Sequence, residues 1–254
     1  MKRYLTLLAA LAALTLALSF LAGCSGERKP SISAGIDACA LCNMVIDRPN
    51  QACGYFMGSE FVTFDAPSCL LKSYDALRKD DAELPDEIYF TDYKNVTFHR
   101  AETTFFLLTD HIPTVMGARV ICFGEAATAG SYREHDDEKL VDWMSYRLDR
   151  SVPDRQHHIL IDSEGMHPES FDADKGELVE LIVEGKALKD ARTLSIKGYE
   201  DAGQITIPAS GEQVSFRFWA SRPGAGFPVV DMLNGNSLGM IKVSGAHTSD
   251  EEAL

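Results

Sequence analysis

Basic residues are few in this sequence relative to acidic ones. It has 24 Lys and Arg against 38 Asp and Glu among 254 residues, a formal net charge of −14. A charge of this sign repels nucleic acid and anionic lipid, so no nucleic-acid partner is expected, and it favours cations and basic partners. The sequence also lacks a Ser/His/Asp arrangement, a phosphate-binding loop and a pair of catalytic carboxylates, so we do not predict an enzyme.

Long apolar runs are absent after residue 22. Before it, a basic start and an apolar stretch lead into Leu21-Ala22-Gly23-Cys24, which resembles a bacterial lipoprotein signal peptide with its lipobox. Cleavage before Cys24 would leave that cysteine lipidated. An uncleaved membrane anchor is the alternative, because the stretch is close to spanning length.

This interpretation divides the N-terminal region into two parts. Residues 1–23 are the expected signal peptide and residues 24–36 a polar, lipidated tether. We therefore expect the body of the protein on the periplasmic side of a bacterial membrane. Ser25 after the lipidated cysteine is similar to the outer-membrane sorting pattern.

Cysteine is scarce, with six in the sequence and none after position 122. Lipidation of Cys24 leaves five, which are Cys39, Cys42, Cys53, Cys69 and Cys122. In an oxidising compartment an odd number leaves at least one unpaired thiol or a metal-bound thiolate. If the other four form two disulfides, whatever their pairing, Cys42 is the odd thiol.

Residues 37–150 show the order of elements expected of an α+β domain. Alternating apolar residues predict a hairpin over 52–65 with its turn at Gly58-Ser59. A helix with Asp65 as its N-cap follows, and the amphipathic pattern of 136–149 predicts another that closes the domain. Between them we expect strands within 87–93, 96–110 and 118–124 and a helix from about residue 125.

The periodicity of apolar residues changes to two after a linker at about 151–156. Short alternating segments separated by Gly, Pro and Asp predict an all-β sandwich over 157–245. An acidic tail, 246–254, ends the chain.

Several landmarks of the first domain resemble the NosL family, lipoproteins that act as copper chaperones for nitrous oxide reductase. They are, in chain order, the lipobox, CNMVIDRP, the helix after FVTFDA, IYFTDY, FHRAETTFFLL and PTVMGARVICFGEAATA. The family favours glycine where this chain has Asn43. The resemblance implies a NosL-like copper-binding domain over 37–150, with nitrous oxide reductase or its membrane assembly machinery as partner.

The donor atoms agree with that resemblance. Cu(I) is soft and prefers thiolate and thioether sulfur. In an extended segment residues 42 and 44 point to the same face, so Cys42 and Met44 can bind one ion. The resemblance adds Met116 as third ligand. We predict these three as the Cu(I) ligands, with Cys39 and His111 as auxiliary candidates; methionines that merely fill a core are the alternative.

The sandwich is similar to cupredoxin-like domains in the order of its segments, but it has no cysteine. A type 1 copper site needs a Cys and two His, and Asp231 lies about where that cysteine would fall. Electron transfer through such a site is therefore excluded here. We expect a docking module, with at most a weak Cu(I) site at Met232 and Met240.

Three functions follow from the sequence. The predicted one is a lipid-anchored extracytoplasmic Cu(I) chaperone that delivers copper for maturation of nitrous oxide reductase. The first alternative is a periplasmic thiol-disulfide oxidoreductase that uses Cys39 and Cys42, although Pro49 shortly after them makes a poor helix start for such a centre. The second is a structural lipoprotein with bridged or buried cysteines. Structural zinc usually needs a second CxxC, which the sequence lacks.

Overall fold

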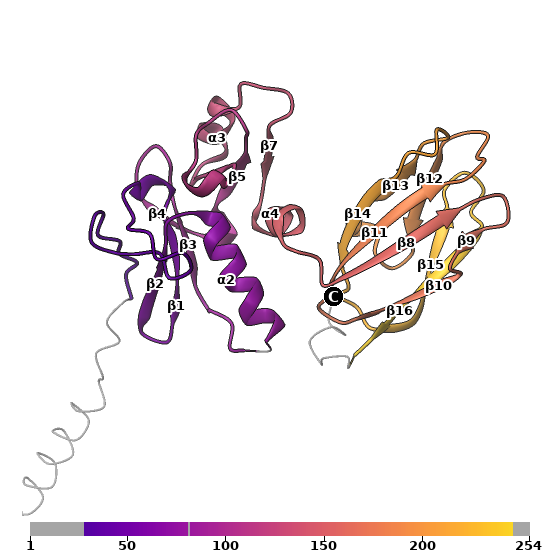
Figure 1. The fold of residues 1–254 in the computed structure, drawn as a ribbon, viewed down its shortest axis with the longest axis horizontal. Coiled ribbons are helices and arrows are strands. Elements are labelled where there is room, and N and C mark those ends of the chain that lie inside the picture. The colour runs from indigo at the N-terminus through magenta and orange to yellow at the C-terminus, as the bar shows by residue number, and fades with distance from the viewer. Residues whose placement is uncertain (1–27, 81, 246–254) are drawn as a thin grey trace, which may run out of the picture. The chain divides into compact units, whose positions relative to one another are not determined.

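The computed structural model describes residues 28–80 and 82–245. This part of the chain is mostly β-structure with few helices (Figure 1). The expected signal peptide, the lipidation site Cys24 and the acidic tail lie outside the described residues. Within them, no helix is both long enough and apolar enough to cross a membrane.

The predicted hairpin opens the first sheet. β1 (Cys53–Met57) and β2 (Glu60–Phe64) pair antiparallel through Met57 and Glu60, which leaves the two-residue turn Gly58-Ser59. Gly58 has a φ of 59°, a left-handed conformation that glycine adopts without steric cost. β3 (Ile88–Thr91) and β4 (Phe98–Arg100) complete the strand order β2-β1-β3-β4.

A second antiparallel sheet joins β6 (Val120–Phe123), β5 (Phe105–Leu108) and β7 (Lys139–Val141) in the order β6-β5-β7. The predicted strand region 96–110 forms two strands, β4 and β5, separated by the 3-10 turn η2 (Ala101–Thr103). Helix α2 (Pro67–Lys79) contacts β1 and β2, and α3 (Ala126–Tyr132) contacts β5 and β6.

The prediction of one helix over 136–149 is wrong. Its first half contains β7, and helix α4 covers only Trp143–Arg150. Asp142 separates the two, because its side chain caps the helix by accepting a hydrogen bond from the Ser145 N–H at 2.8 Å. Leu140 and Val141, which resemble a helical stripe in the sequence, instead pair with β5.

Aromatic rings and cysteines share the core of this region. Phe106 of β5 stacks on Tyr146 of α4 with ring centroids 4.8 Å apart, and it meets Phe90 of β3 edge-on, also at 4.8 Å. The same cluster of buried residues contains Cys39, Cys53, Cys69 and Cys122. The cysteines of the sequence are therefore mostly core residues.

From Arg155 on, the chain forms two sheets whose apolar residues share one core, the predicted sandwich. The strand orders are β10-β16-β15-β12-β13 and β14-β11-β8-β9. The linker is shorter than expected, because β8 already starts at Arg155. The strands are β8 (Arg155–Ile161), β9 (Met166–His167), β10 (Ser170–Asp174), β11 (Leu178–Gly185), β12 (Arg192–Ile196), β13 (Gln204–Ile207), β14 (Val214–Trp219), β15 (Gly224–Asp231) and β16 (Ser237–Ser244).

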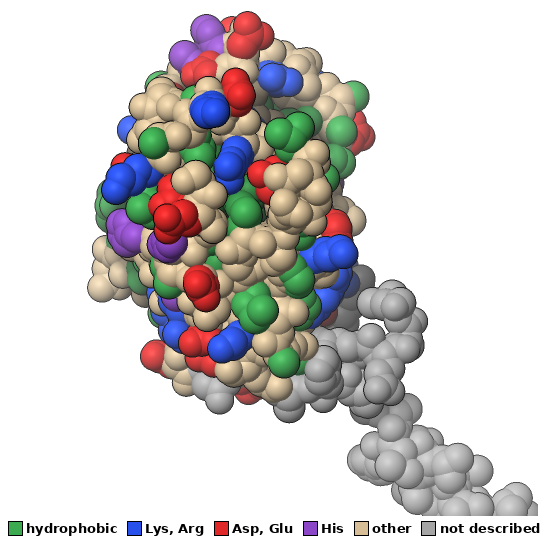
Figure 2. Space-filling view, turned by 90° about the vertical axis from the view of Figure 1, so that its right-hand side faces the viewer, with side chains coloured by type: hydrophobic (Ala, Val, Ile, Leu, Met, Phe, Trp, Pro, Cys, Tyr) green, Lys and Arg blue, Asp and Glu red, His purple; other side chains and the backbone are tan. Residues whose placement is uncertain are grey.

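The surface charge is mixed. On the face shown in Figure 2, acidic and basic side chains are interspersed with apolar ones. No patch of a single charge therefore marks a docking surface on that face.

Candidate metal centre

The CxxC pair lies in a tight hairpin loop. Ala38 and Val45 form an antiparallel bridge, and inside it the Cys39 N–H donates to the Met44 carbonyl at 2.8 Å. The Asn43 N–H donates back to the Cys39 carbonyl at 2.9 Å. The prediction of an extended segment here is wrong, because the chain reverses direction between these residues.

Asn43 closes this loop with a φ of 60°. Glycine enters that left-handed region freely, and asparagine enters it more readily than most other residues. The loop therefore has a physical reason to carry Asn at this position.

A test of this loop follows. Asn43→Gly should leave the free energy of unfolding of the metal-free protein within about 1 kcal/mol of the original value, whereas Asn43→Val should lower it by about 1–2 kcal/mol, because Cβ branching is unfavourable at positive φ. Urea unfolding measures both. Equal stability of the two variants would contradict the proposed role of the left-handed residue.

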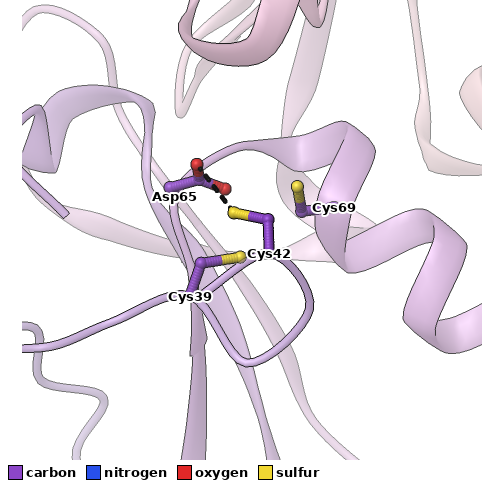
Figure 3. A group of neighbouring side chains, drawn as sticks. All are labelled: Cys39, Cys42, Asp65 and Cys69. Atoms are coloured by element: carbon purple, nitrogen blue, oxygen red, sulfur yellow. Dashed lines mark hydrogen bonds between the residues drawn. The ribbon is translucent and has the colours of Figure 1, made fainter. Parts of the chain in front are cut away.

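Four side chains from separate parts of the sequence converge beneath the loop (Figure 3). The Sγ atoms of Cys39, Cys42 and Cys69 and a carboxylate oxygen of Asp65 all lie within 4.8 Å of one another. Cys39 and Cys42 belong to the loop, Asp65 follows β2, and Cys69 lies in the first turn of α2. Cys42 is half-buried and the other three are buried. We call these four residues the thiol-carboxylate cluster; its donor atoms are suited to a thiophilic metal ion.

Asp65 does not have its predicted role. The N-cap of α2 is Ala66, no side chain caps the helix, and Pro67 occupies its first turn. The Asp65 carboxylate points toward the thiols instead (Figure 3), where Oδ2 accepts a hydrogen bond from the Cys42 S–H at 3.4 Å. Asp65 is only 2% exposed, and its Oδ1 has no hydrogen-bond partner.

The surroundings of the cluster favour protonated thiols. Burial raises the pKa of Cys42, and a hydrogen bond from the Met44 backbone only partly offsets this effect. Burial, together with the neighbouring Asp65 carboxylate and Cys39 thiol, raises the pKa of Cys69. Because the thiolate is the metal-binding form, an incoming ion must displace protons.

The two predicted thioether ligands lie at the surface. Met44 is 49% exposed and Met116 is 54% exposed. Neither methionine is therefore a core-filling residue, which was the alternative interpretation.

A buried glutamine holds the loop that carries Met116. The Gln51 Oε1 accepts a hydrogen bond from the Val115 N–H at 2.7 Å, and its Nε2 donates to the Pro113 carbonyl at 3.4 Å. Gln51 ends the 3-10 turn η1 (Pro49–Gln51), which follows the CxxC loop. Val115 and Cys42 also pack against the same core cluster. The two segments that carry the predicted ligands are thus fixed to one framework.

His111, an auxiliary candidate, is engaged with other side chains. Its ring stacks on His135 with centroids 3.6 Å apart, and its Nε2 lies 3.2 Å from both carboxylate oxygens of Asp137. It is not a member of the thiol-carboxylate cluster. The other auxiliary candidate, Cys39, is a member.

Met232 and Met240 of the sandwich come from different elements. Met240 lies opposite Pro228 in the pairing of β15 with β16, whereas Met232 follows the end of β15. Asp231, at the expected cysteine position, accepts a hydrogen bond from the Leu233 N–H at 2.9 Å. It organises a turn there.

All five cysteines of the described residues are free thiols, so the two disulfides that the sequence left open are not formed in this structure. Cys69 and Asp65 were not among the predicted site residues. A carboxylate and a thiol four residues apart at the start of a helix are visible in the sequence, and this spacing could have indicated both residues as ligands.

Comparisons with known proteins show similarity of fold only, over part of this chain. No protein-family model and no curated protein matches it. Among solved structures, auracyanin B is similar over 37% of this chain and 92% of its own, with 12% identity and a TM-score of 0.30. The metal-binding domain of the Streptococcus pneumoniae Cu(I)-exporting P-type ATPase CopA, solved with Cu(I), has 18% identity over the same shares and a TM-score of 0.30. Similarity at this level assigns neither a family nor a metal.

Proposed function

We propose that this protein is a lipid-anchored extracytoplasmic Cu(I) chaperone that delivers copper for the maturation of nitrous oxide reductase. The main supporting observation is the position of Cys42, a half-buried thiol two residues from the exposed Met44 and next to the other sulfur atoms of the cluster. Cu(I) prefers such sulfur donors at low coordination number. The proposed ligands are Cys42, Met44 and Met116, with Cys39 nearby.

The exposure of these ligands suits transfer. An acceptor can approach the two surface thioethers and replace the ligands one at a time, whereas a fully buried site would have to open first. The fixed loop around Gln51 keeps Met116 available without unfolding. The low ratio of basic to acidic residues also favours a cationic cargo.

The support for the membrane anchor and for the acceptor protein comes from the sequence. The lipobox ending at Cys24 supports attachment to a membrane outside the cytoplasm. The resemblance to NosL supports nitrous oxide reductase, or its membrane assembly machinery, as the acceptor. In this proposal the sandwich positions the partner, and the protein catalyses no reaction.

A thiol-disulfide oxidoreductase is the second candidate. The observation that favours it is the closeness of Cys39 and Cys42, both free thiols within one cluster. Two features oppose it. A reactive CxxC has a lowered thiol pKa and opens a helix, whereas the pKa of Cys42 is raised and the pair lies in a hairpin loop.

The test is an anaerobic Cu(I) titration of the full-length protein in mild detergent against a competing chelator, followed by mixing with copper-free nitrous oxide reductase. We expect one tightly held Cu(I) per chain and its transfer to the reductase. Absence of tight binding would reject the chaperone, and binding without transfer would reject this acceptor. Reduction of a model protein disulfide that depends on Cys39 would instead support the oxidoreductase.

A further inference from the structure

We propose that the thiol-carboxylate cluster is a tetrahedral site for a divalent thiophilic cation of the Zn²⁺ class, with Cys39, Cys42, Cys69 and Asp65 as ligands. This inference does not rest on the Cu(I) proposal. The two sites overlap at Cys42, so the two metals would compete, but Met44 and Met116 have no role in binding the divalent ion.

The geometry is close to that of such a site. The four ligand atoms lie within 4.8 Å of one another. With Zn–S bonds of about 2.3 Å and a Zn–O bond of about 2.0–2.2 Å, tetrahedral ligand atoms are separated by about 3.5–3.8 Å. The widest spacing therefore needs to shrink by only about 1 Å, which side-chain rotation in the loop and at the helix start can supply.

The environment of Asp65 also points to a bound cation. A carboxylate that is 2% exposed and has an unpartnered oxygen is costly, and buried charges are normally paired or bound to a metal. This carboxylate points toward the thiols and does not cap the helix (Figure 3). Carboxylate oxygen is an ordinary Zn²⁺ ligand but a poor one for Cu(I). The presence of Asp65 among the ligands therefore favours Zn²⁺ over Cu(I).

The charge of the four ligands favours a divalent over a monovalent ion. When all four ligands are deprotonated they carry four negative charges, of which Zn²⁺ neutralises two and Cu(I) one. Among the described residues, none of the four forms an ion pair with a Lys, Arg or His side chain. A buried site whose ligands form no ion pair with a cationic side chain favours the ion of higher charge. The complete cluster thus suits a divalent ion, while Cu(I) is better held by Cys42 and the outer thioethers.

The experiment uses Co²⁺ as a spectroscopic probe and Zn²⁺ as competitor, with the full-length protein reduced and free of metal. We expect one Co²⁺ per chain with the intense d–d bands of tetrahedral coordination and thiolate-to-cobalt charge-transfer bands, both abolished by one equivalent of Zn²⁺. Asp65→Asn and Cys69→Ser should each lower Zn²⁺ affinity at least about tenfold. Asp65→Asn should change Cu(I) affinity far less.

Two matched controls separate the sites. Met44→Leu should leave Zn²⁺ affinity unchanged, and so should Cys122→Ala, which removes a buried free thiol outside the cluster. An octahedral Co²⁺ spectrum, or Zn²⁺ binding that is insensitive to Asp65→Asn, would overturn the proposal. Asparagine has nearly the same size as aspartate, so the metal-free Asp65→Asn variant should fold, as circular dichroism can show. Should it not fold, Cys42→Ser tests the same site, and unchanged Zn²⁺ affinity in that variant would overturn the proposal. The Co²⁺ and Zn²⁺ readouts involve no copper, so they succeed or fail independently of the chaperone proposal.

Discussion

Replacing Cys42 with serine should lower Cu(I) affinity at least about a hundredfold, because a hydroxyl group is a poor ligand for a soft monovalent ion. Serine is nearly the same size as cysteine, and this side chain is half-buried in a surface loop, so the fold should be retained. The loop hydrogen bonds of Cys39 and Asn43 use backbone atoms and do not depend on the thiol. Anaerobic competition with a Cu(I) chelator measures the loss.

Methionine variants test the rest of the ligand set. Met44→Leu and Met116→Leu keep the size of the side chain and remove only the thioether, so each should weaken Cu(I) binding by about tenfold, less than loss of the thiolate does. Cys122→Ala is the control and should bind as the unaltered protein does. If both leucine variants retain full affinity, Cu(I) is not held by the proposed three ligands.

The regular parts of the fold were predictable because their signals are local. Alternating apolar residues around Gly58-Ser59 produce the β1–β2 hairpin, and the spacing from Leu70 on produces α2. The prediction of secondary structure fails where one continuous apolar pattern spans two different elements. At 136–149, the capping Asp142 divides an apolar stripe into β7 and α4. Along β15, Pro228 and the irregular pairing near Gly224 interrupt the regular pattern of a strand, and pairing with β16 stabilises it.

The candidate site was predictable only in part. The CxxC loop is visible in the sequence because both cysteines lie within it. Asp65 and Cys69 form an ordinary helix-start pattern, and only the packing of α2 against the hairpin brings them to the loop. The structure also explains Asn43 through its positive φ, a property that residue spacing cannot show.

The largest expected effect on stability comes from Phe106. Its ring is fully buried, stacks on Tyr146, and meets Phe90 edge-on, so it joins β3, β5 and α4 in one core. Phe106→Ala should therefore lower the free energy of unfolding by about 3–5 kcal/mol, through lost burial and the cavity left behind. Urea unfolding followed by near-ultraviolet circular dichroism measures this change.

Phe105 provides the matched control, because it is adjacent in β5 but only half-buried and packs against the smaller cluster around Leu107 and Phe123. Phe105→Ala should lower the free energy of unfolding clearly less than Phe106→Ala does; equal losses would contradict the assignment of Phe106 to the central core.

The core around Phe106 also contains Cys39 and Cys69. A divalent ion bound by the folded cluster alone should restore part of the stability of Phe106→Ala by mass action, and no restoration by Zn²⁺ would show that the cluster does not bind it in the folded state.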